Sequence, residues 1–454
     1  MKKNQNLLEG PISKPLISLS VPMIIAFGFQ TSFNFVDRFF VSRLGDVSTA
    51  AIGMAFIVQL VIIAIGSGMG MGLNSYISRT LGAGQKEKAV SAALHSFLLA
   101  LVVGLLIWWI GSATQHTLFR ALGAKGALLQ QVTAYLSILF PFAPVYLLTM
   151  ICNNIFRGWG DTVYPMKFMV SATLANIILD PIFIFGLGPV TSMGIKGAAL
   201  ATGISRVLSL IYLMYVILGK GLPVKLKWQW FKWDLNIIKG IFQVGLPASA
   251  GQVLTSVSIS IMFLIIKKYG DDARAAYTIA FTYEMVAFLP VLGIGQAVTI
   301  LTGHNYGAKK YQRIKKVYFT ALKYAIAMTI PATISVSIAP HWFAEVFART
   351  PEVADITARA LRILSPAYAL AGIYICTVSS FQGLGLGSYQ LYATLIRMFV
   401  LITPLAWLGT FLFGLDGVWG GIVLANAIID AILLIWYHQL YYKRLVTGRI
   451  QTLR

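Results

Sequence analysis

Two aspartates, Asp37 and Asp180, interrupt long apolar stretches of this sequence. A charged side chain at the centre of a membrane-spanning helix costs roughly 2.5–3.5 kcal/mol on insertion scales, so such residues usually face a protein interior or a water-filled cavity. Asn34 precedes Asp37 by three residues and Asn176 precedes Asp180 by four, which places each amide on the helix face of its carboxylate. Arg38 points about 100° away from Asp37 around the helix and is expected to extend outward. Carboxylates and amides offer hard oxygen ligands that suit a proton or Na⁺.

Tyr135 and Thr202 fall at the same predicted depth as the two aspartates. Counted from the outer ends of the predicted spans, all four positions lie about six or seven residues deep, or roughly 10 Å at the rise of an α-helix. We therefore predict one cation- or proton-coupling pocket formed by Asp37, Tyr135, Asn176, Asp180 and Thr202, with Asn34 in support. A possible Na⁺ would be held by Asp37, Asn176, Asp180 and Thr202, and no other metal is expected. A hydrogen-bonded structural network is the alternative interpretation of these residues.

Other charged residues also fall within apolar stretches. Arg397 and Asp430 lie at similar depths in the last two predicted spans, and we predict a structural ion pair between them. Glu284 has no obvious partner and is the best candidate in the C-terminal half for contact with a cationic substrate. Arg206 follows Thr202 by one helical turn, and it could face the pocket or reach a backbone carbonyl.

The composition explains why these charges matter. Of 454 residues, 57% are hydrophobic and 11% are charged, with a mean hydropathy of +0.76. Soluble domains contain far more charge, so the sequence predicts a polytopic α-helical membrane protein rather than a β-barrel. The net charge of +21 would suggest nucleic-acid binding in a soluble protein, but here Lys and Arg are expected to mark cytoplasmic loops.

About twelve apolar stretches are long enough to cross a bilayer. They cover residues 15–42, 50–78, 88–113, 130–157, 163–187, 195–218, 238–267, 275–302, 314–340, 357–382, 388–413 and 417–441. The Lys and Arg bias between them predicts that both termini are cytoplasmic in a plasma or inner membrane. Alternating Lys and Trp in residues 225–233 predict an interfacial linker over 219–237.

The two halves of the sequence are related by duplication. Pro22 matches Pro247 at an offset of 225 residues, and the same offset relates Gly45 to Gly270. We therefore predict an N-lobe at 1–218, which contains the cation site, and a C-lobe at 238–454, which ends in a basic tail. The two six-helix bundles would be related by an axis along the membrane normal. At this offset Asp37 pairs with Met262, so the polar set is confined to the N-terminal half.

The chain resembles the MATE (multidrug and toxic compound extrusion) transporters along nearly its whole length. The motifs that carry the resemblance are Asn34-Phe35-Val36-Asp37 with Leu44-Gly45, Phe156-Arg157-Gly158-Trp159-Gly160-Asp161-Thr162, Asp180-Pro181-Ile182-Phe183-Ile184-Phe185-Gly186, Gly194 to Ala199, Pro290 to Ala297, and Gly307-Ala308. The resemblance implies the V-shaped MATE fold and export of amphipathic, mostly cationic compounds in exchange for H⁺ or Na⁺. Within the family, the chain is similar to the DinF-like branch. The cation-site positions of that branch would match Asp37, Tyr135, Asn176, Asp180 and Thr202, and Asn153 or Asn154 would match a further polar position. The acid of the NorM-like branch falls at about Thr255 and is missing.

The expected mechanism is alternating access. Pro22 lacks an N–H and weakens its helix locally, so cation binding at the aspartates would bend the first span there and expel the drug. No ATP-binding loop occurs, and no cofactor is expected beyond the coupling ion. The expected partners are small-molecule drugs and the lipid bilayer, not nucleic acid, and the chain is expected to act as a monomer. The alternatives are a lipid-linked oligosaccharide flippase of related fold and, less in keeping with twelve duplicated spans, an intramembrane enzyme.

Overall fold

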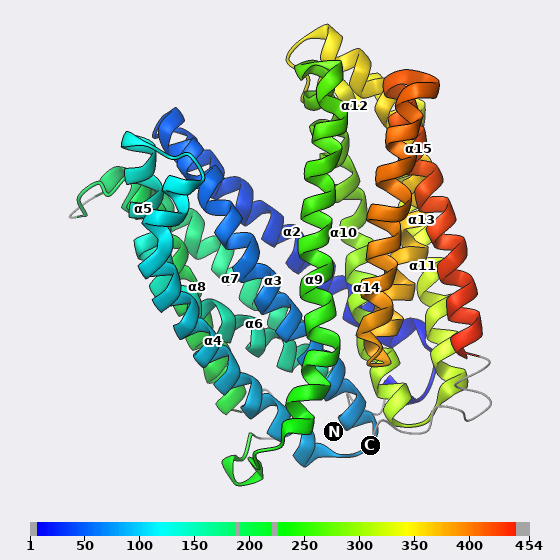
Figure 1. Cartoon of the computed structure of the whole chain (residues 1–454). Helices are drawn as coiled ribbons and strands as arrows, with labels where there is room; N and C mark the ends of the chain where they lie inside the picture. The colour runs from blue at the N-terminus through cyan, green and yellow to red at the C-terminus, as the bar shows by residue number, and fades with distance from the viewer. Residues whose placement is uncertain (1–6, 188–189, 220–225, 442–454) are drawn as a thin grey trace. The chain divides into compact units, whose positions relative to one another are not determined.

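Every regular element of the computed structural model is helical in the residues that it describes, which are 7–187, 190–219 and 226–441. Figure 1 shows these helices coloured along the chain. The predicted all-α fold is therefore confirmed. The basic tail beyond Tyr441 and residues 220–225 of the predicted linker lie outside the described residues.

The N-terminal repeat contains long helices joined by short turns. They are α2 (Ser13–Ser42), α3 (Asp46–Gly82), α4 (Lys86–Ala121), α5 (Gly126–Leu139), η1 (Phe140–Phe142), α6 (Ala143–Gly158), α7 (Val163–Pro181), η2 (Ile182–Gly186) and α8 (Ile195–Leu218). Pro141 and Pro144 lie where α5 passes through η1 into α6. Proline cannot donate a helical hydrogen bond, so one apolar span is divided into two α-helical pieces there.

The C-terminal repeat follows the short η3 (Trp228–Trp230). Its helices are α9 (Leu235–Ile266), η4 (Lys267–Tyr269), α10 (Asp271–Gly307), α11 (Tyr311–Ile338), α12 (Pro340–Glu345), α13 (Pro351–Gly383), α14 (Gly387–Leu395), η5 (Ile396–Ile402) and α15 (Thr403–Leu440).

The number of membrane spans agrees with the sequence prediction. Eleven helices in the described residues are long and apolar enough to cross a bilayer, and the last, Gly387–Leu440, contains 54 residues. At 1.5 Å per residue that is about 80 Å, more than twice the hydrocarbon thickness. The helix breaks at Phe413 and Gly414, where Gly414 has φ +60°, so this segment supplies two spans and the total is twelve.

The helices pack into two compact units whose boundaries fall inside helices. The first, here called the N unit, is Ile25–Ser249; the second, the C unit, contains the chain up to Ile24 together with Ala250 onward. Each boundary comes two residues after a helix-interior proline, Pro22 in α2 and Pro247 in α9. The first part of α2 therefore packs in the C unit, and the first part of α9 packs in the N unit. The lobe division at 218 and 238 stays a prediction from the sequence.

The duplication is visible in the packing of each unit. In the N unit, Gly68 lies against the backbone of Gly245, where a Cβ atom would not fit. In the C unit, the equivalent Gly293 lies against Ile24 and the carbonyl of Ser20. Gly68 is related to Gly293, and Ser20 to Gly245, by the 225-residue offset. Small residues let membrane helices approach closely, and the same contact occurs once in each unit.

Candidate functional site

A cavity of about 460 Å³ in the N unit lies between the second half of α2 and the first half of α3. Its wall contains Asn34, Asp37, Arg38, Val41, Ser42, Thr49, Ile52, Gly53, Phe56 and Gln59. Asn34 and Asp37 share this wall, as their spacing of three residues predicts. The carboxylate of Asp37 is therefore on the surface of a space large enough for a small molecule.

Behind this wall, a hydrogen bond connects the cavity to a buried tyrosine. Gln59, whose side chain lines the cavity, donates from Nε2 to the hydroxyl of Tyr135 at 2.8 Å. Tyr135 is fully buried on α5. Gln59 was not predicted as a site residue. It is a polar residue within an apolar stretch of α3, and that signal was available in the sequence.

The second aspartate is fully buried on α7. Asp180 Oδ1 accepts a hydrogen bond at 2.9 Å from Nδ2 of Asn176, one helical turn earlier. The spacing of four residues therefore produces the contact that the sequence predicts. Asp180 also interacts electrostatically with Asp37, and Tyr135 interacts with both carboxylates. The structure thus brings Asp37, Tyr135, Asn176 and Asp180 together.

Several buried oxygens in this cluster have no hydrogen-bond donor among the described residues. They are Oδ1 of Asp37, Oδ2 of Asp180 and Oδ1 of Asn176. Oγ1 of Thr202, on α8, is also buried without a partner among the described residues, and its place in the coupling pocket stays a prediction. Most buried polar atoms in proteins are paired, because an unpaired one loses its hydration without compensation. A proton on either carboxylate, or a small hard cation, would satisfy these acceptors.

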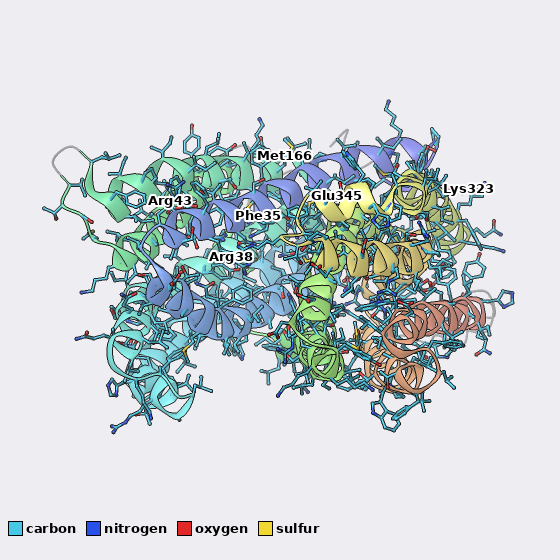
Figure 2. The ribbon with its side chains drawn as sticks, turned by 90° about the horizontal axis from the view of Figure 1, so that it is seen from above. Phe35, Arg38, Arg43, Met166, Lys323 and Glu345 are labelled. Carbon is cyan, nitrogen blue, oxygen red and sulfur yellow. The ribbon has the colours of Figure 1, made fainter. Side chains whose placement is uncertain are left out.

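Two arginines of the N unit have positions that the sequence left open or predicted wrongly. Arg38 is exposed, but it lines the same cavity as Asp37, with its guanidinium 5.5 Å from the centre of the Phe56 ring; Figure 2 labels it on α2. The expectation that Arg38 turns away from Asp37 is therefore wrong. Arg206 is buried, and its guanidinium lies 5.1 Å from the ring centre of Phe33 and 4.9 Å from that of Tyr146.

The remaining predicted N-terminal residues lie away from the cavity wall. Asn153 and Asn154 are buried on α6, and each donates from Nδ2 to the carbonyl one turn earlier, at 3.0 and 2.9 Å. Neither lines the cavity. Pro22 lies within α2, 15 residues before Asp37, which is about 22 Å along the helix.

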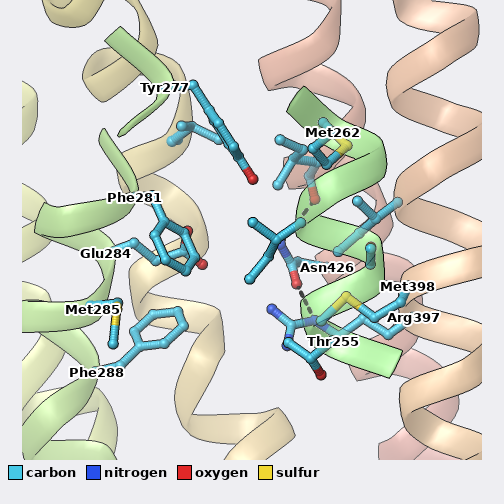
Figure 3. A pocket seen from close by; sticks show the side chains of 15 residues that line it. Thr255, Met262, Tyr277, Phe281, Glu284, Met285, Phe288, Arg397, Met398 and Asn426 are labelled. Carbon is cyan, nitrogen blue, oxygen red and sulfur yellow. Dashed lines mark hydrogen bonds between the residues drawn. The ribbon is translucent and has the colours of Figure 1, made fainter. Parts of the chain in front are cut away.

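The C unit contains a second cavity, of about 220 Å³ (Figure 3). Glu284 and Arg397 both line it, together with Thr255, Met262, Tyr277, Phe281, Met285, Phe288, Met398 and Asn426. Glu284 belongs to α10 and Arg397 to η5, so the two charges come from different elements. They interact electrostatically. The position of Glu284 is compatible with the predicted contact to a cationic substrate, which stays a prediction.

The predicted ion pair between Arg397 and Asp430 is wrong. Arg397 Nε donates to Oδ1 of Asn426 at 2.9 Å, and its guanidinium lies 4.5 Å from the centre of the Tyr374 ring. Asp430 is one helical turn beyond Asn426, and its Oδ1 has no hydrogen-bond partner among the described residues. Arg397 and Asp430 interact only at longer range. Equal depth in two helices did not determine which side chain the guanidinium reaches.

The two cavities occupy equivalent positions in the repeats. The pairs that line both are Asn34 and Ile259, Asp37 and Met262, Ile52 and Tyr277, Phe56 and Phe281, and Gln59 and Glu284. Each pair is separated by 225 residues. The two cavities therefore lie at equivalent positions in the repeats, but their walls contain different polar groups.

Comparisons with known proteins agree with this duplicated architecture. The MatE family model matches twice, at residues 22–182 and 247–408. Similar proteins include the FAD transporter of Shewanella oneidensis, 26% identical over 94% of this chain and 95% of its own length. Another is the multidrug export protein MepA of Staphylococcus saprophyticus, 26% identical over 94% of each chain.

Solved structures are similar over almost the entire chain. A MATE protein crystallised in the bent conformation has a TM-score of 0.93 and 32% identity, covering 99% of this chain and 100% of that one. An outward-facing multidrug resistance transporter of the MATE family has a TM-score of 0.91 and 32% identity, covering 98% of each chain. The predicted fold class is confirmed by this similarity.

Proposed function

Because the chain belongs to the MATE family, we propose that it exports amphipathic, mostly cationic compounds in exchange for H⁺ or Na⁺. Transporters of this family are not enzymes, and the chain is accordingly a multi-pass membrane transporter. The relatives named as multidrug export proteins support a broad range of small-molecule substrates. The DinF-like branch, the cytoplasmic termini, the cell-membrane location and the monomeric state belong to this proposal.

The observation that carries ion coupling is the cluster of acceptors around Asp37 and Asp180. Asp37 and Asp180 interact with one another inside the N unit, and Asp37 also interacts with the adjacent Arg38. Neither carboxylate forms a salt bridge within 4 Å among the described residues. Uncompensated acids at membrane depth are strongly unfavourable unless they are neutralised. A proton or Na⁺ bound between Asp37, Asn176, Asp180 and Thr202 would neutralise them and use the unpaired oxygens.

The mechanism requires the cation to bind one conformation better than the other, since a ligand of equal affinity shifts nothing. Asp37 lies on the second part of α2, which packs in the N unit, whereas the part before Ile25 packs in the C unit. Pro22 lies just before this change and lacks a hydrogen-bond donor. Cation binding at Asp37 would reposition the second part of α2 about this point and reduce the volume of the cavity that holds the drug.

A flavin nucleotide is the competing substrate, favoured by the similarity to a protein named as an FAD transporter. Arg38 in the wall of the N-unit cavity could meet the phosphates of such a molecule. Ion coupling and substrate choice can be tested in one experiment that combines two ion gradients with two substrates.

The test is transport in proteoliposomes under an imposed pH gradient or Na⁺ gradient, applied separately. A cationic dye and FAD are the two substrates. We expect one gradient to drive transport of the dye, and Asp37→Asn and Asp180→Asn to abolish that drive. Asp46→Asn, on an exposed acid at the start of α3, is the matched control and should retain it. Full gradient-driven transport by folded Asp37→Asn and Asp180→Asn proteins would refute the coupling role, and transport of FAD alone would refute the drug substrates.

A further inference from the structure

A basic groove of about 700 Å³ runs along the first turns of α11 in the C unit. Three lysines line it, namely Lys315, Lys316 and Lys323, and Phe319 lies between them. Ser13 at the start of α2 and Tyr441 after the end of α15 also line it. The groove thus combines positive charge, a hydroxyl group and exposed aromatic surface, since Phe319 is 45% exposed.

Two of the lysines in this groove, Lys316 and Lys323, have no ion-pair partner within the described part of the chain. None of the residues in its wall is acidic. Lys316 and Lys323 are both exposed. The nearby Glu9 lies 3.7 Å from Lys310 instead. An anion is therefore the ligand that the groove would attract.

The position of the groove along α11 indicates that a bound anion would lie at a membrane interface. α11 has 28 residues, or about 42 Å, whereas the hydrocarbon core is about 30 Å thick. The excess of about 12 Å, or about eight residues, can carry Lys315 and Lys316 at the start of the helix into the headgroup region, whereas Lys323 begins about 18 Å along it and reaches back through its long side chain. Lys316, Thr320 and Lys323 follow one helix face at spacings of four and three. Lysine side chains near helix ends extend their ammonium groups to the interface while their carbon chains cover apolar surface. Lys323 is labelled in Figure 2.

The equivalent face in the other repeat is covered by protein. Lys316 corresponds to Ser91 on α4, and Thr320 corresponds to His95. Ser91 Oγ donates to the carbonyl of Lys232 at 3.4 Å, and His95 accepts at Nε2 from the backbone N–H of Asp234 at 3.2 Å.

Aromatic contacts complete this cover. The His95 ring lies 4.8 Å from that of Phe231 and 5.4 Å from that of Trp233, measured between ring centres. In the N unit, the amphipathic linker therefore lies on the face that is basic and exposed on α11. The repeat shows that this helix face is suited to an amphipathic occupant.

We propose that the groove on α11 binds an anionic phospholipid, with its phosphate among Lys315, Lys316 and Lys323 and its acyl chains along Phe319. Clusters of lysine at the ends of membrane helices attract anionic headgroups. The segment after Tyr441 is a weaker candidate, because it contains Lys443, Arg444, Arg449 and Arg454 and no acid. Like charges would repel it from the groove.

The test is native mass spectrometry of the full-length protein in detergent, titrated with phosphatidylglycerol or phosphatidylethanolamine. The wild type should bind phosphatidylglycerol preferentially. The double variant Lys316→Gln/Lys323→Gln should lose that preference by about 25-fold, from about 1 kcal/mol for each lysine near a membrane surface. The matched control is Lys267→Gln/Lys268→Gln, which removes two exposed lysines of η4 and should bind like the wild type. Equal thermal unfolding of all three proteins confirms that the variants are folded.

Three outcomes would overturn the proposal. A wild type without preference for phosphatidylglycerol would leave the basic tail or a second copy of the chain as the occupant. An equal loss in the control pair would show attraction to net charge rather than to the groove. Competition by millimolar inorganic phosphate as strong as that by the lipid would identify a soluble phosphate compound as the ligand.

Discussion

The cavity of the N unit and the cavity of the C unit have the same origin and different chemistry. Asp37 in one wall is replaced by Met262 in the other, whereas Gln59 is replaced by Glu284. In the C unit, the carboxylates of Glu284 and Asp430 both interact with Arg397. In the N unit, Asp37 and Asp180 interact with one another, and Asp37 also interacts with the exposed Arg38.

The two repeats share aromatic and glycine positions that serve packing, but they differ in their charged groups. Phe56 and Phe281 remain aromatic at equivalent places in the two walls, and the close glycine contacts are also repeated. The charged groups are not repeated. Glu284 and Asp430 both interact with Arg397, whereas Asp37 interacts only with the exposed Arg38 and Asp180 interacts with no arginine of the described residues. Two acids with so little compensation still call for an external cation. The comparison therefore favours the N unit as the site of ion coupling.

The largest expected effect on transport comes from replacing Asp37 in the N-unit cavity by methionine, the residue at the equivalent position of the C-unit cavity. Asp37→Met should reduce gradient-driven export by about 100-fold, the upper end of usual coupling energies, because the cation loses a ligand. Proteoliposome transport measures this effect. The reverse change, Met262→Asp, should leave coupling in place, since Asp37 and Asp180 are intact. Retained coupling in Asp37→Met would break the distinction between the two cavities.

The second prediction concerns the charge compensation in the C unit. Arg397→Met should lower the free energy of unfolding by about 2–3 kcal/mol, because a hydrogen bond to a charged group is lost and two carboxylates lose their cation. Thermal unfolding in detergent measures the change. Arg359→Met, at an exposed surface pair, is the control and should change stability by less than about 1 kcal/mol. Similar losses in both variants would contradict an internal compensation.

The third prediction concerns the packing that both repeats share. Gly68→Ala and Gly293→Ala should each reduce stability by about 1–2 kcal/mol, because the added methyl group has no room. At Gly68 it meets Ser249 and the Gly245 carbonyl, and at Gly293 it meets Ile24 and the Ser20 carbonyl. Gly420→Ala is the control, because a Cβ atom there has open space. The free energy of unfolding of the three variants gives the comparison. A loss at Gly68 without a loss at Gly293 would show that the two contacts are not equivalent.

The smallest expected effect concerns Tyr135. Tyr135→Phe removes the hydroxyl that accepts from Gln59, which should lower stability by about 1 kcal/mol, the usual contribution of one hydrogen bond. Tyr215→Phe, at a tyrosine that is 78% exposed, should have no measurable effect. A several-fold loss of transport in Tyr135→Phe without a change in stability would support the predicted membership of Tyr135 in the coupling pocket.

Much of the fold was predictable because membrane helices are determined by length and apolarity. The twelve spans and the 225-residue repeat required only these properties and a count of matching residues. Within a helix, the pairing of Asn176 with Asp180 followed from the spacing of four residues.

Contacts between helices were less predictable. Depth along a helix does not determine its rotation, so Arg397 reached Asn426 instead of the predicted Asp430. Arg38 was placed wrongly for a similar reason, since its long side chain reaches the cavity despite its angular distance from Asp37. Gln59 was not predicted as a site residue because an amide in an apolar stretch has many alternative partners.

The change of packing unit within α2 and within α9 has a consequence for the origin of the chain. Each repeat contributes the beginning of its first helix to the core of the other, with Leu16 and Leu19 in the C unit and Ile237 and Ile241 in the N unit. A single ancestral copy would complete its own core only as a domain-swapped homodimer. Gene fusion would then have converted an exchange between two molecules into an exchange within one. By the same logic, a chain cut in the linker should yield two fragments that fold when expressed together and fail when expressed alone.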